Sequence, residues 1–168
     1  MQDIENAYVR LAGQLQQAID AGDFGALKDL SFLLDLSRIT FVETDETSGR
    51  KISKPVAVYV AEHGTVEMMS YLIDDGCDVN ARDSFGNTPL MAAVSEDRFE
   101  MVVYLMKQPH VQKHIHNYYG ETVSSIAWLN NNRRIVEYLE KNFVEAEMLP
   151  TRSADMMHAD KMPNKFLM

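Results

Sequence analysis

Apolar residues recur along this chain at the spacing of short amphipathic helices, and these helices come in pairs. Residues 99–105 are Phe-Glu-Met-Val-Val-Tyr-Leu, in which apolar side chains three and four positions apart share one helical face. The preceding stretch, residues 83–93, contains Thr88 and Pro89, which are typical of a helix cap and of the first helical position. The pattern predicts one helix, a short turn and a second helix.

The helix pair repeats at a nearly constant interval. Leu72, Leu105 and Leu139 follow one another at steps of 33 and 34 residues, each near the end of a second helix. A weaker unit lies at residues 18–30, where small residues and glycine again precede an amphipathic stretch. Terminal repeats depart from the pattern because one of their faces meets water. An interval of this length indicates a stack of similar units.

Neither helix of a unit can bury its apolar face alone, so the units are expected to stack on one another. The residues expected to form a continuous core on the second helices are Val66, Met69, Leu72, Val102, Val103, Leu105, Ile135, Val136 and Leu139. Trp128 is expected to be at least partly buried at the C-terminal end of the stack. Asn131, and less easily Asp97, can adopt the left-handed conformation of a turn between helices.

These observations predict an all-α domain over residues 1–142, followed by a flexible tail over residues 143–168. The domain divides into units at about 7–36, 54–76, 87–107 and 121–142, with an extended finger at 37–53. In that finger, apolar and polar residues alternate on both sides of 45–49, which predicts a β-hairpin. The tail holds five of the eleven methionines, and its composition favours disorder over the alternative of an adaptable binding strand.

The segment Thr88–Ala93 resembles the T-P-L-H-x-A signature of the ankyrin family, with methionine in place of the histidine. Residues 74–83 resemble the family's inter-repeat stretch, with Cys77 where a small alanine is usual. The resemblance covers residues 10 to 142 approximately and is strongest at 64–105. It implies a solenoid of helix-turn-helix units with projecting loops or short β-hairpin fingers, and it implies a function in binding other proteins.

Composition narrows the class of partner. The chain has 16 lysines and arginines against 25 aspartates and glutamates, a formal net charge of -9, which repels phosphate backbones and anionic lipids. A protein partner with a basic surface is favoured, and nucleic acid and membrane partners are not. The start of the chain lacks the pattern of a secretory signal and no apolar run approaches a membrane span, so a cytoplasmic protein is expected, as a monomer or a 1:1 complex.

Enzyme chemistry finds little support, because the chain has no serine elbow, no glycine-rich phosphate loop after a strand and no cysteine pair. We therefore expect no catalytic residue and no cofactor. Cys77 is either a reactive thiol or an inert packed residue, and its place in the repeat favours the second. His110, His114 and His116 are possible metal ligands, but zinc requires about four ligands in fixed geometry. Polar contact residues are the favoured interpretation of these histidines.

In the family that the chain resembles, partners contact the finger tips and the exposed side of the first helices. The positions selected on this basis are Arg82, Ser84, Phe85, Asn87, Ser95, Glu96, His116, Tyr118, Tyr119, Glu121, Leu129 and Asn130. Aromatic residues on loops supply contact area at low entropic cost, although each could instead pack against the next finger. Glu43, Asp45 and Glu46 on the first finger are further candidates, either for a basic partner or as a solvated turn.

The sequence thus predicts a protein-interaction module rather than an enzyme. The favoured form is an acidic inhibitor or immunity-type protein that binds and occludes one partner, such as an enzyme or a toxin. The first alternative is an adaptor with several partners or a secreted ankyrin effector. The second alternative is a metal-dependent activity at the histidine-rich finger.

Overall fold

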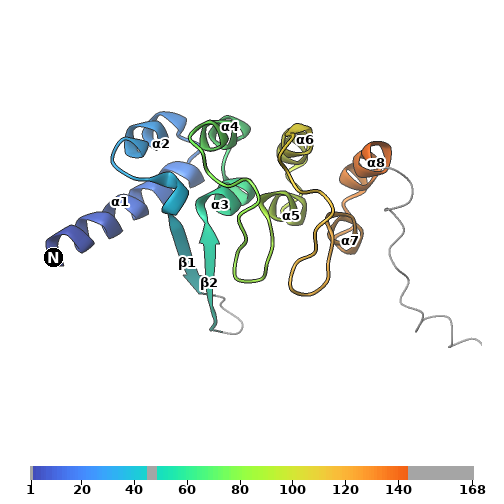
Figure 1. Ribbon diagram of the computed structural model, residues 1–168, viewed down its shortest axis with the longest axis horizontal. Coiled ribbons are helices and arrows are strands. Elements are labelled where there is room, and N and C mark those ends of the chain that lie inside the picture. Colours follow the sequence, from blue (N-terminus) through green and yellow to red (C-terminus); the bar gives the residue numbers. More distant parts are fainter. Residues whose placement is uncertain (1, 45–48, 144–168) are drawn as a thin grey trace, which may run out of the picture.

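A computed structural model describes residues 2–44 and 49–143 and shows helix pairs stacked side by side (Figure 1). The helices are α1 (Gln2–Asp20), α2 (Phe24–Ser31), α3 (Val56–His63), α4 (Val66–Asp74), α5 (Pro89–Ser95), α6 (Phe99–Lys107), α7 (Val123–Leu129) and α8 (Arg133–Asn142), with a short 3-10 turn, η1 (Leu36–Arg38). The strands are β1 (Thr40–Thr44) and β2 (Lys51–Pro55). First helices α3, α5 and α7 form one row, and second helices α2, α4, α6 and α8 form the other. The predicted helix-turn-helix units are present, and the hairpin adds a small sheet.

Local signals in the sequence set where the first helices begin. The hydroxyl of Thr88 accepts the N–H of Met91 at 3.4 Å, and Pro89 occupies the first helical position of α5. One unit later, the hydroxyl of Thr122 accepts the N–H of Ser125 at 3.1 Å. The predicted helix start at Thr88 is confirmed, and the next unit repeats it without a proline.

The turns between the two helices of a unit use left-handed backbone at residues other than glycine. Asp97 has a φ of 52° between α5 and α6, and Asn131 has a φ of 57° between α7 and α8. Both positions were expected to adopt this conformation, which short polar side chains tolerate better than branched ones do.

The core runs through the second helices as a continuous apolar row. The predicted core residues that are buried are Met69, Leu72, Val102, Leu105, Ile135 and Leu139. Val66 and Val136 are half-buried and pack against this row. Val103 is also half-buried rather than central, because its neighbours Val102 and Leu105 occupy the inward face of α6.

The extended finger is the predicted β-hairpin. Strands β1 and β2 pair antiparallel, with Thr40 opposite Pro55 and Thr44 opposite Lys51. Phe41 turns inward, where its ring centroid lies 4.7 Å from that of Tyr59, while Val42 points to solvent. This alternation fixes the hairpin to the stack by one face.

Three expectations about the ends of the stack need correction. Helix α1 begins at Gln2, before the predicted start at residue 7, and Phe143, assigned to the tail, is buried. The rest of the predicted tail lies outside the described residues. Trp128 is 57% exposed. The equivalent residue of the preceding unit, Val94, lies 34 residues earlier and is fully buried because the next unit covers it. No further unit covers Trp128 within residues 2–44 and 49–143.

Tyr59 joins the first unit to the second. Its hydroxyl donates to Asp20 at 2.7 Å and accepts from the side chain of Gln16 at 3.0 Å. Burial, the hydrogen bond to Asp20 and nearby carboxylates raise the pKa of Tyr59 to about 12. Burial, with Asp75 and Asp35 nearby, likewise raises the pKa of Cys77 to about 12. Both groups are therefore held in their neutral forms.

These two groups make stability depend on pH in the alkaline range. A group whose pKa is higher in the folded state than in the unfolded state stabilises the folded state. This contribution is complete below the unfolded pKa, which is 9.0 for the Cys77 thiol and 10.0 for Tyr59. That contribution is lost as the pH rises toward about 12. We expect the free energy of unfolding to fall across this range and the fall to be smaller in Cys77→Ala, as measured by urea denaturation at each pH. An equal fall in both proteins would contradict the assignment to Cys77.

Candidate protein-binding surface

The projecting loops, which we call fingers, are joined edge to edge by backbone hydrogen bonds. The N–H of Ser84 donates to the carbonyl of Ser53 at 3.0 Å, and the N–H of Ser53 donates to the hydroxyl of Ser84 at 2.7 Å. One finger further, the N–H of Tyr118 donates to the carbonyl of Phe85 at 2.9 Å. The fingers consequently form one ribbon that presents their tips together.

A buried polar side chain organises each of the two later finger tips. Asp83 accepts the N–H groups of Phe85 and Asn87, both at 2.8 Å. Asn117, 34 residues later, accepts the N–H groups of Tyr119 and Glu121 at 3.0 and 2.9 Å. Neither residue was among the positions predicted from the sequence, although a polar residue at the same position of two units was a usable signal.

Asn117 also connects the two fingers. Its amide nitrogen donates to the side-chain oxygen of Asn87 at 2.9 Å and to Oε2 of Glu121 at 2.8 Å. Asn87 in turn donates to Oδ2 of Asp83 at 3.1 Å. Asn87 and Glu121, both selected from sequence, are thus held in place by the fingers as well as exposed to a groove described below.

The aromatic tips are accessible although they also contact neighbouring fingers. Tyr118 is 70% exposed and Tyr119 is 66% exposed. Phe85 is half-buried, and its ring centroid lies 6.0 Å from that of Tyr119. Gly86 lies so close to the Tyr118 ring that an added Cβ would stand 2.8 Å from it. These aromatic side chains therefore pack against neighbouring fingers and still leave surface that a partner could contact.

Arg82 has a structural contact that the sequence did not reveal. Its guanidinium donates to the carbonyl of Gly86 at 3.2 Å and to the carbonyl of His116 at 2.9 Å. These bonds tie its charge to the backbone of two fingers. The side chain of His116 remains exposed beside this link.

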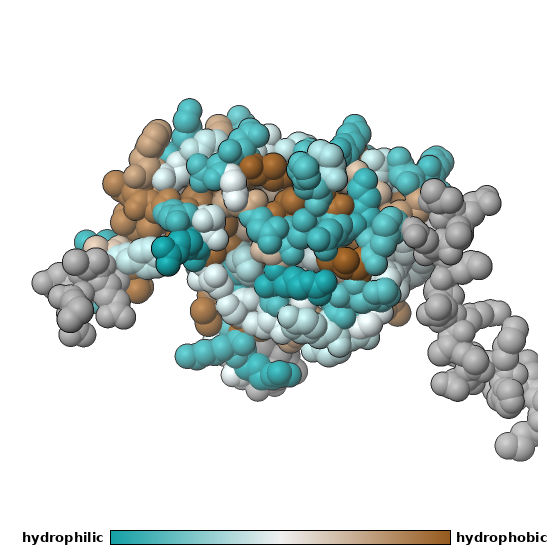
Figure 2. Space-filling view, viewed as in Figure 1, coloured by the Kyte–Doolittle hydropathy of each residue, from teal (hydrophilic) through white to brown (hydrophobic). Residues whose placement is uncertain are grey.

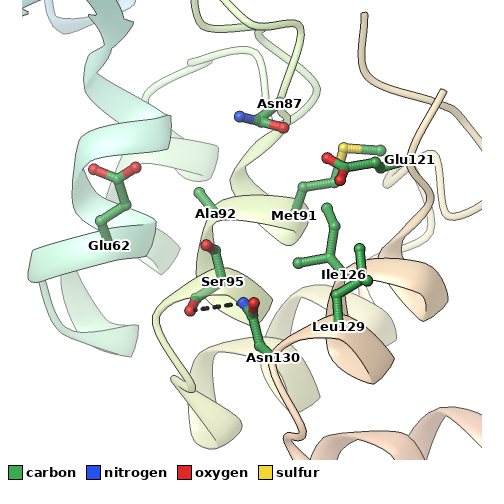
Figure 3. A pocket seen from close by; sticks show the side chains of 9 residues that line it. All are labelled: Glu62, Asn87, Met91, Ala92, Ser95, Glu121, Ile126, Leu129 and Asn130. Carbon is green, nitrogen blue, oxygen red and sulfur yellow. Dashed lines mark hydrogen bonds between the residues drawn. The ribbon is translucent and has the colours of Figure 1, made fainter. Parts of the chain in front are cut away.

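A groove runs across the first helices on the side that faces the fingers. Residues at equivalent positions of successive units form its walls: Glu62, Ser95 and Leu129 recur at steps of 33 and 34, as Ala92 and Ile126 do at 34. Figure 3 shows Ala92 and Ser95 of α5 at the centre, with Glu62 of α3 on one side and α7 on the other. The cavity volume is about 170 Å³.

The charged side chains along this groove, Glu62 and Glu121, are carboxylates and accept hydrogen bonds. The amide nitrogen of Asn130 donates to the carbonyl of Ser95 at 3.3 Å, which leaves the Asn130 oxygen as an acceptor. The carboxylate of Glu121 lies at the finger end of the groove. The neighbouring Glu96, also selected from sequence, is exposed at the end of α5. The groove therefore suits a ligand that carries donors.

Comparison with known proteins identifies the repeat. A family model described as ankyrin repeats (3 copies) matches residues 15–115 and 57–149. The chain belongs to the ankyrin-repeat family. The resemblance inferred from Thr88–Ala93 is thereby confirmed, together with the helix-turn-helix fold class and a general role in binding proteins.

Three relatives show how far this ankyrin-repeat similarity extends. I-Kappa-B like protein G1 of Microplitis demolitor bracovirus is 27% identical over 73% of this chain and 69% of its own length. I-Kappa-B like protein G2 of the same virus is 31% identical over 55% of this chain and 51% of its own length. Mouse Rabankyrin-5 is 25% identical over 58% of this chain but only 8% of its own length. The similarity to Rabankyrin-5 thus covers only a small part of that protein.

Glu43 on the β1–β2 finger forms an ion pair within the protein. Lys54 lies 2.8 Å from Glu43 and 2.6 Å from Glu62, so one cation bridges two carboxylates. Burial works to lower the pKa of Lys54, but the two carboxylates raise it overall. Burial raises the pKa of Glu62, against the effect of Lys54. Asp45 and Glu46, the other candidates on this finger, lie outside the described residues.

Among the described residues, Cys77 and the histidines of the 107–116 segment do not form a metal site. Cys77 is buried, in agreement with the inert packed role. The carbonyl of His110 accepts from the Asn80 amide at 2.8 Å, and the ring of His114 lies 5.1 Å from that of Phe143. In residues 2–44 and 49–143, no three side chains of His, Cys, Asp or Glu are grouped so that they could hold a metal ion.

Two further surface properties concern regions outside the finger tips and the groove. Apolar surface gathers at the end that carries α1 and α2, where Phe32 is 78% exposed and Leu33 is 68% exposed (Figure 2). The corresponding ends of α4, α6 and α8 carry charged residues, so this feature is peculiar to the first unit. In the part of the chain that the structure describes, no helix is long and apolar enough to cross a membrane.

Proposed function

We propose that this ankyrin-repeat protein binds one basic protein partner through its finger tips and the adjacent groove, and that it acts by occluding that partner. The observation that carries the proposal is the exposed pair Tyr118 and Tyr119, held by Asn117 next to the groove that Glu121 lines. Rigid aromatic side chains beside a polar groove are typical of interface hot spots. The same hydrogen bonds preorganise both parts of the surface, which reduces the entropic cost of binding.

Charge supports a basic partner in a 1:1 complex. The net charge of -9 attracts a basic surface over a long range and gives fast association that weakens with salt. The candidate surface is built from three neighbouring units, a size that suits a single protein partner. Binding in the cytoplasm is part of the proposal, supported by the one buried cysteine, which stays a free thiol.

The relatives support a binding role with occlusion as its outcome. Two of them are named I-Kappa-B like proteins, and their similarity covers 73% and 55% of this chain. A binding surface that includes both finger tips and a groove can cover a functional site on its partner. An adaptor would instead bind several partners and leave their activities unchanged, which separates the two functions experimentally.

Affinity capture with a tyrosine variant tests the proposed surface. We expect the wild-type protein to retain one stoichiometric partner and Tyr118→Ala/Tyr119→Ala to bind it at least about 100-fold more weakly, because each hot-spot side chain contributes about 2 kcal/mol. Titration calorimetry with the recovered partner measures the affinity. Both tyrosines are exposed, so circular dichroism is expected to show an unchanged fold.

Phe32→Ala/Leu33→Ala is the matched control, since it removes an equally exposed apolar pair at the opposite end. Loss of the partner in this control, with retention in the tyrosine variant, would contradict the proposed surface. A bound partner with unchanged activity would contradict occlusion. Several weakly bound partners would favour an adaptor.

A further inference from the structure

We propose that the groove across α3, α5 and α7 takes one arginine side chain of the partner, with its guanidinium against Glu121. This inference rests on the proposed function, because it names the chemistry of the partner at that surface. The proposal concerns the groove rather than the aromatic finger tips. Because it names a single side chain as the ligand, a small peptide can test it before any partner is known.

The shape of the groove suits a long, thin side chain. Ala92 is small and lies at the centre, so the floor is low where the walls of α3 and α7 rise on either side. Leu129, which is 71% exposed, supplies most of the apolar surface of the groove, while Ile126 and Met91, which also line it, are buried. An alkyl stem can pack along this surface while its charged end reaches a polar group.

Glu121 supplies a carboxylate whose charge is not compensated by its neighbour. Its Oε2 accepts a hydrogen bond from the neutral amide of Asn117 at 2.8 Å, which orients the group without neutralising it. Glu62 at the other wall differs, because Lys54 lies 2.6 Å from it. Arg98 donates to the carbonyls of Glu62 and Gly64, so its guanidinium is tied to the end of α3. A cation entering the groove is thus directed to Glu121.

The opposite end of the groove offers further acceptors. Helices α5 and α7 end there at Ser95 and Leu129, and helix C-termini carry partial negative charge. The side-chain oxygen of Asn130 lies at the same end. Backbone N–H groups flanking the arginine can donate to these acceptors. No side chain that lines the groove carries a positive charge that could pair with an anionic ligand.

Arginine is favoured over lysine by the geometry of the carboxylate. A planar guanidinium forms two parallel hydrogen bonds to one carboxylate and is more weakly hydrated than an ammonium group. One carboxylate oxygen of Glu121 is already hydrogen-bonded to Asn117, and each carboxylate oxygen can accept more than one donor. The Glu121 carboxylate can therefore accept both hydrogen bonds of the guanidinium and keep the one from Asn117.

The probe is the peptide acetyl-Gly-Arg-Gly-amide, titrated into the full chain labelled with nitrogen-15 and followed by NMR. We expect saturable shifts confined to amide signals of groove residues, including Ala92, Glu121 and Asn130. The matched peptide with citrulline, which has the same shape without the charge, is expected to produce no saturable shift. Equal shifts from both peptides, or shifts centred elsewhere, would overturn the proposal.

A charge-removing variant locates the guanidinium. Glu121→Gln keeps an oxygen that can accept from Asn117, and we expect it to weaken binding of the arginine peptide at least about fivefold, in line with a hydrogen bond to a charged group. Glu67→Gln, an exposed change on the second helix of another unit, is the control and should leave the affinity unchanged. Equal affinity in Glu121→Gln and the wild-type protein would overturn the proposal. Failure to capture a partner would leave this peptide result intact, so the two proposals fail separately.

Discussion

Replacing Leu105 with alanine is expected to lower the free energy of unfolding by about 3–5 kcal/mol. Leu105 is fully buried in α6, and that helix packs against α4 on one side and α8 on the other. The cavity left by the substitution is therefore enclosed by three units and cannot collapse easily. Urea denaturation followed by circular dichroism measures the change, with a shift in the midpoint at a constant slope.

Two further leucine-to-alanine variants make this prediction specific. Leu129→Ala is chemically identical but occurs at a residue that is 71% exposed, so we expect a change below about 0.5 kcal/mol. Leu139→Ala lies in the last described unit, which has a neighbouring unit on one side, and we expect an intermediate loss. Equal losses at Leu105 and Leu129 would show that stability does not follow burial in this stack.

Replacing Asp83 with alanine is expected to destabilise the protein by about 2–4 kcal/mol. The substitution removes the acceptor of two backbone N–H groups and of the Asn87 side chain, all within one finger. Asn87 also accepts from Asn117, so the loss spreads to the next finger. Thermal and urea denaturation measure the stability, and amide exchange at Phe85 and Asn87 reports the local opening.

The conservative variant Asp83→Asn separates hydrogen bonding from charge. Asn117 performs the same role one unit later with a neutral amide, so asparagine at position 83 should keep most of the stability. We expect a loss about half that of Asp83→Ala. Asp75→Ala, at an exposed position after α4, is the control and should be nearly neutral. Equal stability of Asp83→Ala and the wild-type protein would contradict the role assigned to this residue.

Features encoded within a few residues were predictable from the sequence. The cap at Thr88, the left-handed turns at Asp97 and Asn131 and the alternation around the hairpin all depend on local backbone preferences. The period of the repeat predicted which faces of the second helices are buried. These predictions succeeded because each unit contains the same local signals, whatever stands beside it.

Contacts between units were not predictable in the same way. Arg82 donates to the carbonyl of His116 in the next finger, and Asn117 reaches Asn87 thirty residues earlier in the chain. Each contact depends on the distance between neighbouring units and on the direction of a particular side chain. The sequence selected Arg82 without revealing this hydrogen bond, because it does not show what lies across the interface.

By itself, then, the sequence determined the repeat, its family and the class of function, because the period and the short signature are properties of the chain read in order. Only the tertiary structure decided which of two equivalent positions in successive units faces solvent. Val94 and Trp128 occupy equivalent places in successive units, yet one is buried and the other 57% exposed. The tertiary structure likewise brought Glu121 to the groove beside Ala92 and Leu129. Exposure depends on whether a neighbouring unit covers a position, which no local pattern records.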